Sequence, residues 1–192
     1  MAVGPAIYST TNMEGVDVNQ VFYLDTKTYP EYPAAPFNVG VQAFGTDGSA
    51  WVWCTASVSL PAGTVVIVTE TPNSWSVAAI GGTTVAAPLG DLLGVVGGSL
   101  GTLTIGAPSG TQTASYFWVQ RNGNCPNVRS LAATTIDHLL YSSATTAGVT
   151  TSTGGGSGTT YTLTGIVISQ AVGSAAGPNT GILNWPVVGA GA

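Results

Sequence analysis

The sequence predicts an all-β fold, either a β-barrel or a two-sheet, jelly-roll-like sandwich, with an extended N-terminal arm. Short apolar or alternating runs are separated by turns rich in glycine and proline, which is the pattern of strands joined by tight turns. No window shows the sustained periodicity of an amphipathic helix. With 192 residues, the chain is long enough to bury a real core within one domain. We therefore expect an arm over residues 1–38 and a β domain over residues 39–192.

The arm combines irregular sequence with aromatic side chains. Its stretch YPEYPAAPF contains prolines that favour extended backbone and exclude a regular helix. Tyr29, Tyr32 and Phe37 accompany these prolines. A disordered tail is the alternative, although the segment carries more apolar surface than disordered segments usually do. We expect an arm that lies across a neighbouring surface and whose removal leaves the β domain folded.

The stretch from 39 to 68 reads as three strands joined by the turns GTDG and PAG. Side chains alternate along SAWVWC, so Trp51 and Trp53 lie on one face of this strand, while Val52 and Cys54 lie on the other. Both faces are apolar. A strand of this kind is covered on both sides, either inside a sandwich or barrel or beneath a partner subunit.

Further strands are expected along the remainder of the chain, at 75–80, 91–96, 116–120, 128–131 and 161–169. Between two of them, the segment RNGNCPN at 121–127 has the composition of a turn cluster. The ranges 39–96 and 116–168 each offer an aromatic strand, a polar turn region and a closing strand with a central glycine. They are candidates for a duplicated β unit, the alternative being that β-rich sequences share such features in general.

Composition points to an assembly. Charged residues make up 6% of the chain, against roughly 25% in an ordinary soluble domain, so a free monomer would be poorly protected against association. Three basic residues against eight acidic ones exclude the positive surface that holds nucleic acid. No apolar run reaches membrane-spanning length, and no basic segment followed by an apolar core begins the chain. We expect a cytosolic product without an export signal that binds neither nucleic acid nor membrane.

One segment matches a catalytic motif in form. Residues 97–101 read GGSLG, which fits the G-x-S-x-G turn that exposes a nucleophilic serine, Ser99, between a strand and a helix. The following text, GTLTIGAPSG, cannot form that helix, and the single histidine, His138, directly follows Asp137 rather than standing apart from an acid. We expect no catalytic residues, and a small hydrolase at Ser99 is the alternative.

Metal and cofactor sites are not indicated either. Cys54 and Cys125 are far apart in the sequence, and the single histidine has no clustered partners that would complete a zinc site. Two cysteines without an export signal are typical of buried, small apolar residues, with a disulfide as the alternative. The sequence therefore predicts no metal and no cofactor.

The aromatic residues are the candidates for an interaction surface. We expect a homo-oligomer, with a trimer favoured over a dimer, because closed symmetry covers apolar surface without leaving open edges. The interface candidates are aromatic residues of the strands and the arm: Trp51, Trp53, Phe117, Trp118, Tyr29, Tyr32 and Phe37. The alternative is a sugar-binding face built from the aromatic side chains of the strands, with Trp75 among them.

Three segments carry a resemblance to a known family. They are GVQAFGTDGSAWVWCTASVSLPAGTVVIV, the strand YFWVQRNG, and the closing segment LTGIVISQAVG with ILNWPVVG. Together they resemble the head decoration (cement) proteins of tailed bacteriophages. The resemblance implies a non-enzymatic virion protein, made in the host bacterial cytoplasm, that sits as a homo-oligomer on the outer capsid surface and bridges major capsid proteins. The alternative is a head fibre or tail-associated adhesin that binds host glycans.

Overall fold

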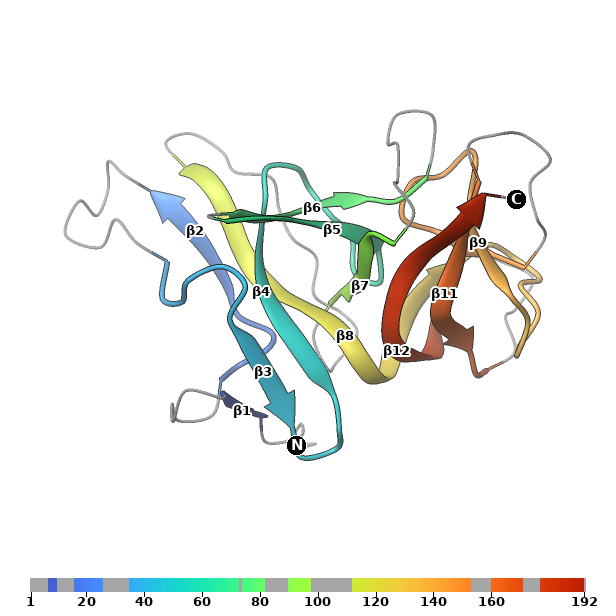
Figure 1. Ribbon diagram of the computed structural model, residues 1–192, viewed down its shortest axis with the longest axis horizontal. Coiled ribbons are helices and arrows are strands. Elements are labelled where there is room, and N and C mark those ends of the chain that lie inside the picture. The colour runs from blue at the N-terminus through green and yellow to red at the C-terminus, as the bar shows by residue number, and fades with distance from the viewer. Residues whose placement is uncertain are drawn as a thin grey trace.

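The computed structural model shows an all-β chain, which confirms the predicted fold class (Figure 1). It describes residues 7–9, 16–25, 35–72, 74–81, 90–97, 112–152, 160–170 and 177–191. Within these ranges there is no helix, and the strands form one 12-stranded sheet. The strands are β1 (Ile7–Ser9), β2 (Val21–Asp25), β3 (Gln42–Gly45), β4 (Ala50–Ala56), β5 (Val65–Thr71), β6 (Ser74–Ala79), β7 (Leu92–Val96), β8 (Gln112–Ser130), β9 (Leu140–Ser142), β10 (Thr150–Thr151), β11 (Tyr161–Ile168) and β12 (Gly177–Gly191).

The long strand β8 organises the sheet. It pairs with β2 and β4 along its first part, with β7 near its middle, and with β12 and β10 toward its end. The predicted turn cluster at 121–127 is therefore wrong, because β8 runs through these residues. Pairing with β4 and β12 overrides a local composition that favours turns. Gly123 permits the close packing there: its φ is +93°, and a Cβ on it would lie 2.8 Å from the Cα of Ser49.

The strand pairings close into two rings that share β8. The first ring consists of β8, β4, β6, β5 and β7, and the second of β8, β12, β11, β9 and β10. Figure 1 shows the second ring at the C-terminal end of the molecule, with β8 running from one ring into the other. Because ring closure removes free edges, β1 and β2 are the strands that end the sheet in the described part of the chain.

Three groups of buried apolar side chains fill the fold. One is contributed by the strands of the first ring and contains Phe117 and Val119 of β8. A second lines the second ring and the adjoining strands β5 and β7, with Cys125 and Leu183 among its members. The third group, which includes Trp118, lies on the other face of β4 and β8. The sheet around β4 and β8 is thus covered on both faces.

The alternation predicted along β4 is confirmed. Trp51 and Trp53 belong to the tryptophan-containing group on one face, whereas Val52 and Cys54 belong to the core of the first ring. Burial on both sides explains why every residue from Ala50 to Cys54 is apolar.

The described parts of the arm lie on the sheet of the same chain. β2 pairs along β8, with Val21 opposite Phe117. Val18 is buried in the tryptophan-containing group, and Phe22 and Phe37 pack against it. The expectation that this segment lies across a neighbouring surface does not fit these residues, because their apolar side chains already cover the core of their own chain. Tyr29 and Tyr32 lie outside the described residues.

The two rings can be compared with the predicted duplication. Strands β4 to β7 of the first ring lie within the first predicted repeat, 39–96. Strands β9 to β11 of the second ring lie within the second predicted repeat, 116–168. Strand β12 lies outside both ranges, and β8 belongs to both rings. The central glycines of the two closing strands also differ, since Gly165 has a φ of +83° while Gly94 keeps ordinary strand backbone. A common origin for the two ranges stays a prediction.

Candidate functional site

The aromatic residues predicted as an interface lie mainly in the core. Trp51, Trp53, Phe117 and Trp118 are each at most 2% exposed within the single chain. Phe37 is half-buried and packs on two of them, with its ring centre 5.3 Å from that of Trp53 and 5.4 Å from that of Trp118. The chain itself already covers these rings, so in this fold they are not available to a partner subunit or to a sugar. We therefore remove the four strand residues from the set of interface candidates.

A different aromatic residue faces solvent. Trp185 of β12 is 42% exposed and has a φ of +44°, a left-handed backbone conformation that is unusual for a bulky residue. Such strain persists only where the surrounding structure enforces it, and it is concentrated at functional sites. Trp185 is not among the interface candidates predicted from the sequence. The available signal was the segment NWP, in which a tryptophan directly precedes a proline near the end of an apolar strand.

An irregularity between β11 and β12 produces this backbone conformation. Thr164 pairs with Val187 and Ile166 pairs with Leu183, so the stretch 184–186 lies opposite Gly165 alone. A Cβ at Gly165 would lie 2.6 Å from the carbonyl oxygen of Asn184, so only glycine lets the two strands approach this closely. The bulge re-aims the Trp185 side chain away from the regular alternation of β12.

Arg121 supports the exposed indole. Its guanidinium carbon lies 5.5 Å from the centre of the Trp185 ring, within the range of a cation–π interaction. The side chain is 7% exposed; its Nε donates to the Leu93 carbonyl at 3.0 Å, and an Nη donates to the Pro186 carbonyl at 3.4 Å. Burial lowers the pKa of Arg121, while the nearby Cys54 and Glu70 act in the opposite direction. Two carbonyls and the indole face thus hold one buried cation beneath an exposed aromatic ring.

Other large apolar side chains are also exposed. They are Phe44, Val58, Ile136, Leu139 and Ile182. None of these five residues has a positive φ. Trp185 is therefore distinguished from them by its left-handed backbone and by the cation beneath its ring.

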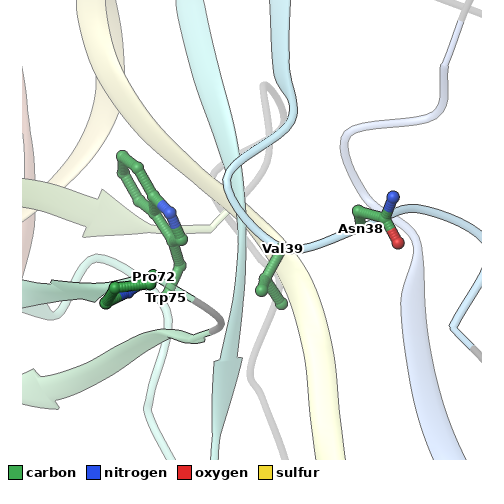
Figure 2. Close-up of a pocket in the computed structure, with 4 residues that line it drawn as sticks. All are labelled: Asn38, Val39, Pro72 and Trp75. Carbon is green, nitrogen blue, oxygen red and sulfur yellow. The ribbon is translucent and has the colours of Figure 1, made fainter.

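A cavity of about 370 Å³ lies at another place in the fold (Figure 2). Its lining includes Asn38 and Val39, which precede β3, and Pro72 and Trp75 of the β5–β6 hairpin. Trp75 is half-buried and is the one strand aromatic from the predicted sugar-binding set that keeps substantial exposure. The lining side chains named here carry no charge.

The groups considered for catalysis are not assembled in the described structure. Ser99 lies outside the described residues. His138 is exposed, and the backbone N–H of Asp137 donates to the Ile168 carbonyl in a turn where Asp137 has a φ of +56°. Among the residues that the structure describes, no three His, Cys, Asp or Glu side chains come together as metal ligands.

Cys54 and Cys125 are both free and buried, which confirms the prediction that they behave as small apolar residues. Burial raises the pKa of the Cys125 thiol from 9.0 to about 11, and a hydrogen bond from the backbone of Asn127 offsets part of the rise. Burial also raises the pKa of Cys54, although the positive charge of Arg121 opposes that shift. Protonated, buried thiols are poor nucleophiles and poor metal ligands.

No family model matches the chain, and no curated protein matches it with significance. In the part of the chain that the structure describes, no helix is long and apolar enough to cross a membrane.

Proposed function

We propose that this chain is a non-enzymatic structural protein of a tailed-phage virion. It binds the outer surface of the capsid and stabilises the shell by bridging neighbouring major capsid proteins. The proposal rests on the resemblance of three sequence segments to head decoration proteins and on the low charge of the chain, which suits a subunit that hides surface in an assembly. The protein would be made in the bacterial cytoplasm and become part of the particle.

One structural observation carries the proposal furthest, the exposed Trp185 held over buried Arg121. Tryptophan and arginine are the residues most enriched among those that dominate binding energy at protein interfaces. A ring that is already oriented loses little conformational entropy when a partner covers it. The backbone strain at Trp185 is consistent with a role beyond folding, because a regular strand would have placed the residue without it. We therefore assign Trp185 as the anchor that contacts the major capsid protein.

Self-association is part of the same proposal, with a trimer favoured and a dimer possible. The contact cannot use the tryptophans of β4 and β8, since the chain buries them itself. It must use outer surface instead, where single exposed apolar residues such as Phe44 and Ile182 are available. Light scattering on the purified full chain tests this part: we expect a trimer at micromolar concentration, and a stable monomer would contradict it.

The shell-binding role is tested by co-sedimentation of the purified chain with capsid shells that lack it. We expect saturable binding that stabilises the shells against heat or chelators. If the chain stays in the supernatant at all concentrations, the capsid proposal fails.

A second candidate role, a head fibre or tail-associated adhesin that binds host glycans, is favoured by one observation. That observation is the cavity beside Trp75, whose lining suits a neutral sugar.

A further inference from the structure

We propose that the cavity beside Trp75 binds a neutral pyranose sugar of a glycan. This site is separate from the Trp185 anchor, and the inference does not depend on the capsid role. The cavity volume of about 370 Å³ falls at the lower end of the roughly 300–1,000 Å³ typical of ligand pockets. It therefore suits one or two sugar units rather than a large ligand.

The cavity lies between two firmly held segments. On one side, Trp75 and Pro72 belong to the β5–β6 hairpin, where Glu70 pairs with Trp75 and Thr71 pairs with Ser74. On the other side, Asn38 and Val39 lead into a turn tied to the core (Figure 2). Defined walls of this kind are what a preformed small-molecule site requires.

The turn that contains Asn38 is fixed by backbone hydrogen bonds. The N–H of Val41 donates to the Asn38 carbonyl at 3.2 Å, and the N–H of Gly40 donates to the Trp53 carbonyl at 2.8 Å. Gly40 has a φ of +85°, and a Cβ on it would lie 2.5 Å from Nε1 of Trp75. The indole therefore packs directly on the Gly40 backbone, which holds the ring in place beside the cavity.

The chemistry of the lining selects the class of ligand. An indole ring offers a flat apolar surface to the C–H face of a pyranose. The exposed Asn38 amide offers one acceptor and two donors, which matches the paired donors and acceptors of sugar hydroxyl groups. None of the lining side chains named here carries a charge that would compensate an ionic ligand.

An acidic residue of the β5–β6 hairpin, Glu70, disfavours the binding of acidic sugars. Glu70 lies directly opposite Trp75 in the antiparallel pair, so the two side chains project from the same face. Glu70 is an exposed acidic residue. A sugar carboxylate beside it would be repelled, so acidic sugars are disfavoured relative to neutral hexoses and N-acetylhexosamines.

The test uses the indole N–H signals of the full-length protein in two-dimensional NMR spectra. The chain has five tryptophans, which differ in position relative to the cavity. The signal of Trp75 is identified by its loss in Trp75→Phe. The probes are the methyl glycosides of glucose, galactose and N-acetylglucosamine, with N-acetylneuraminic acid as the acidic comparison.

We expect at least one neutral glycoside to shift the Trp75 signal saturably at millimolar concentrations. The signal of Trp185, which is the more exposed indole, serves as the internal control for unspecific stacking and is expected not to move. If no neutral glycoside shifts Trp75, the site assignment is overturned. Equal shifts of Trp185 and Trp75, or a response to the acidic sugar alone, also overturn it.

A matched pair of variants tests the assignment without disturbing the core. Asn38 and Asn184 are both exposed asparagines, but only Asn38 lines the cavity. Asn38→Ala should weaken glycoside binding by about two- to tenfold, the effect of one lost hydrogen bond. Asn184→Ala should leave it unchanged. Equal affinities of the two variants would contradict the proposed contact, whatever the result of the shell-binding assay.

Discussion

The guanidinium carbon of Arg121 lies 5.5 Å from the centre of the Trp185 ring, and Arg121 is buried whereas Trp185 is exposed. Arg121 belongs to β8, the strand shared by the two rings, and Trp185 belongs to a bulge in β12. The strand that both rings share thus supports an exposed aromatic ring. Such an arrangement holds the side chain of a binding residue in one orientation before the partner binds.

Replacing Trp185 by glycine should separate binding from folding. Glycine adopts the φ of +44° without strain. The relief of this backbone strain offsets part of the stability that is lost with the Arg121–Trp185 contact. We expect the midpoint of thermal unfolding to change by only a few degrees. Shell binding should weaken by about 30-fold or more, since truncating an aromatic anchor costs about 2 kcal/mol or more. Thermal melts and co-sedimentation measure the two effects on the same preparation.

Leu139→Ala is the matched control for this variant. Leu139 is also well exposed, but it has no positive φ and no aromatic ring to pack on a cation. It should reduce shell binding much less than Trp185→Gly. If both variants bind shells like the unaltered chain, Trp185 is not the anchor.

Trp53→Ala should destabilise the chain rather than dissociate an oligomer. The Trp53 ring is fully buried, 5.1 Å from that of Trp118. Removing a buried tryptophan side chain typically costs about 3–5 kcal/mol, a large part of a typical stability of about 5–15 kcal/mol. Denaturant titration should show a midpoint far below that of Trp185→Gly. A folded Trp53→Ala monomer of normal stability would contradict the burial of this ring.

Deletion of residues 1–38 should also lower stability, in contrast to the expectation from sequence that the remaining domain stays folded. The truncation removes β2 from the edge of β8 and removes Phe37 from its place over Trp53 and Trp118. We expect a lower urea midpoint and binding of a dye that reports exposed apolar surface. An unchanged midpoint would show that these contacts contribute little.

The thiols give a prediction about pH. Because burial raises the pKa of Cys125 to about 11 from 9.0, the folded state disfavours the thiolate. The corresponding stability is fully present below pH 9 and is lost as the pH rises from 9 toward 11, where the unfolded chain ionises first. The free energy of unfolding should therefore fall over this range by more than in a Cys125→Ala variant.

Thiol reactivity offers a direct check on the same burial. Both cysteines should resist alkylation at pH 8 in the folded chain and react in denaturant. Rapid alkylation of either thiol in the folded protein would contradict the described core.

Local patterns could be read correctly from the sequence. The order Trp51, Val52, Trp53 and Cys54 predicts the two faces of β4. Successive side chains of any β-strand point to opposite faces, so this property requires no knowledge of the neighbouring strands. The segment 121–127 could not be read in this way. Its glycine, asparagine and proline favour turns, and pairing with strands distant in sequence determines that it is extended.

The candidate site at Trp185 could not be predicted from the sequence either, because it also depends on strands that are distant in sequence. The exposure of Trp185 depends on the bulge opposite Gly165 and on the support from Arg121, both of which are contributed by other strands. Aromatic composition alone favoured Trp53 and Trp118, since nothing in the sequence shows that Phe37 and Val18 cover that face. Within the predicted sugar-binding set, Trp75 lines the cavity described above.

The most direct test of the central claim is a cryo-electron reconstruction of capsid shells with this protein bound, at a resolution that shows side chains. We expect density for the chain on the outer surface, with the Trp185 ring buried against the major capsid protein and Arg121 still beneath it. A reconstruction with Trp185 facing solvent, or with no density for the chain on the shell, would contradict the account.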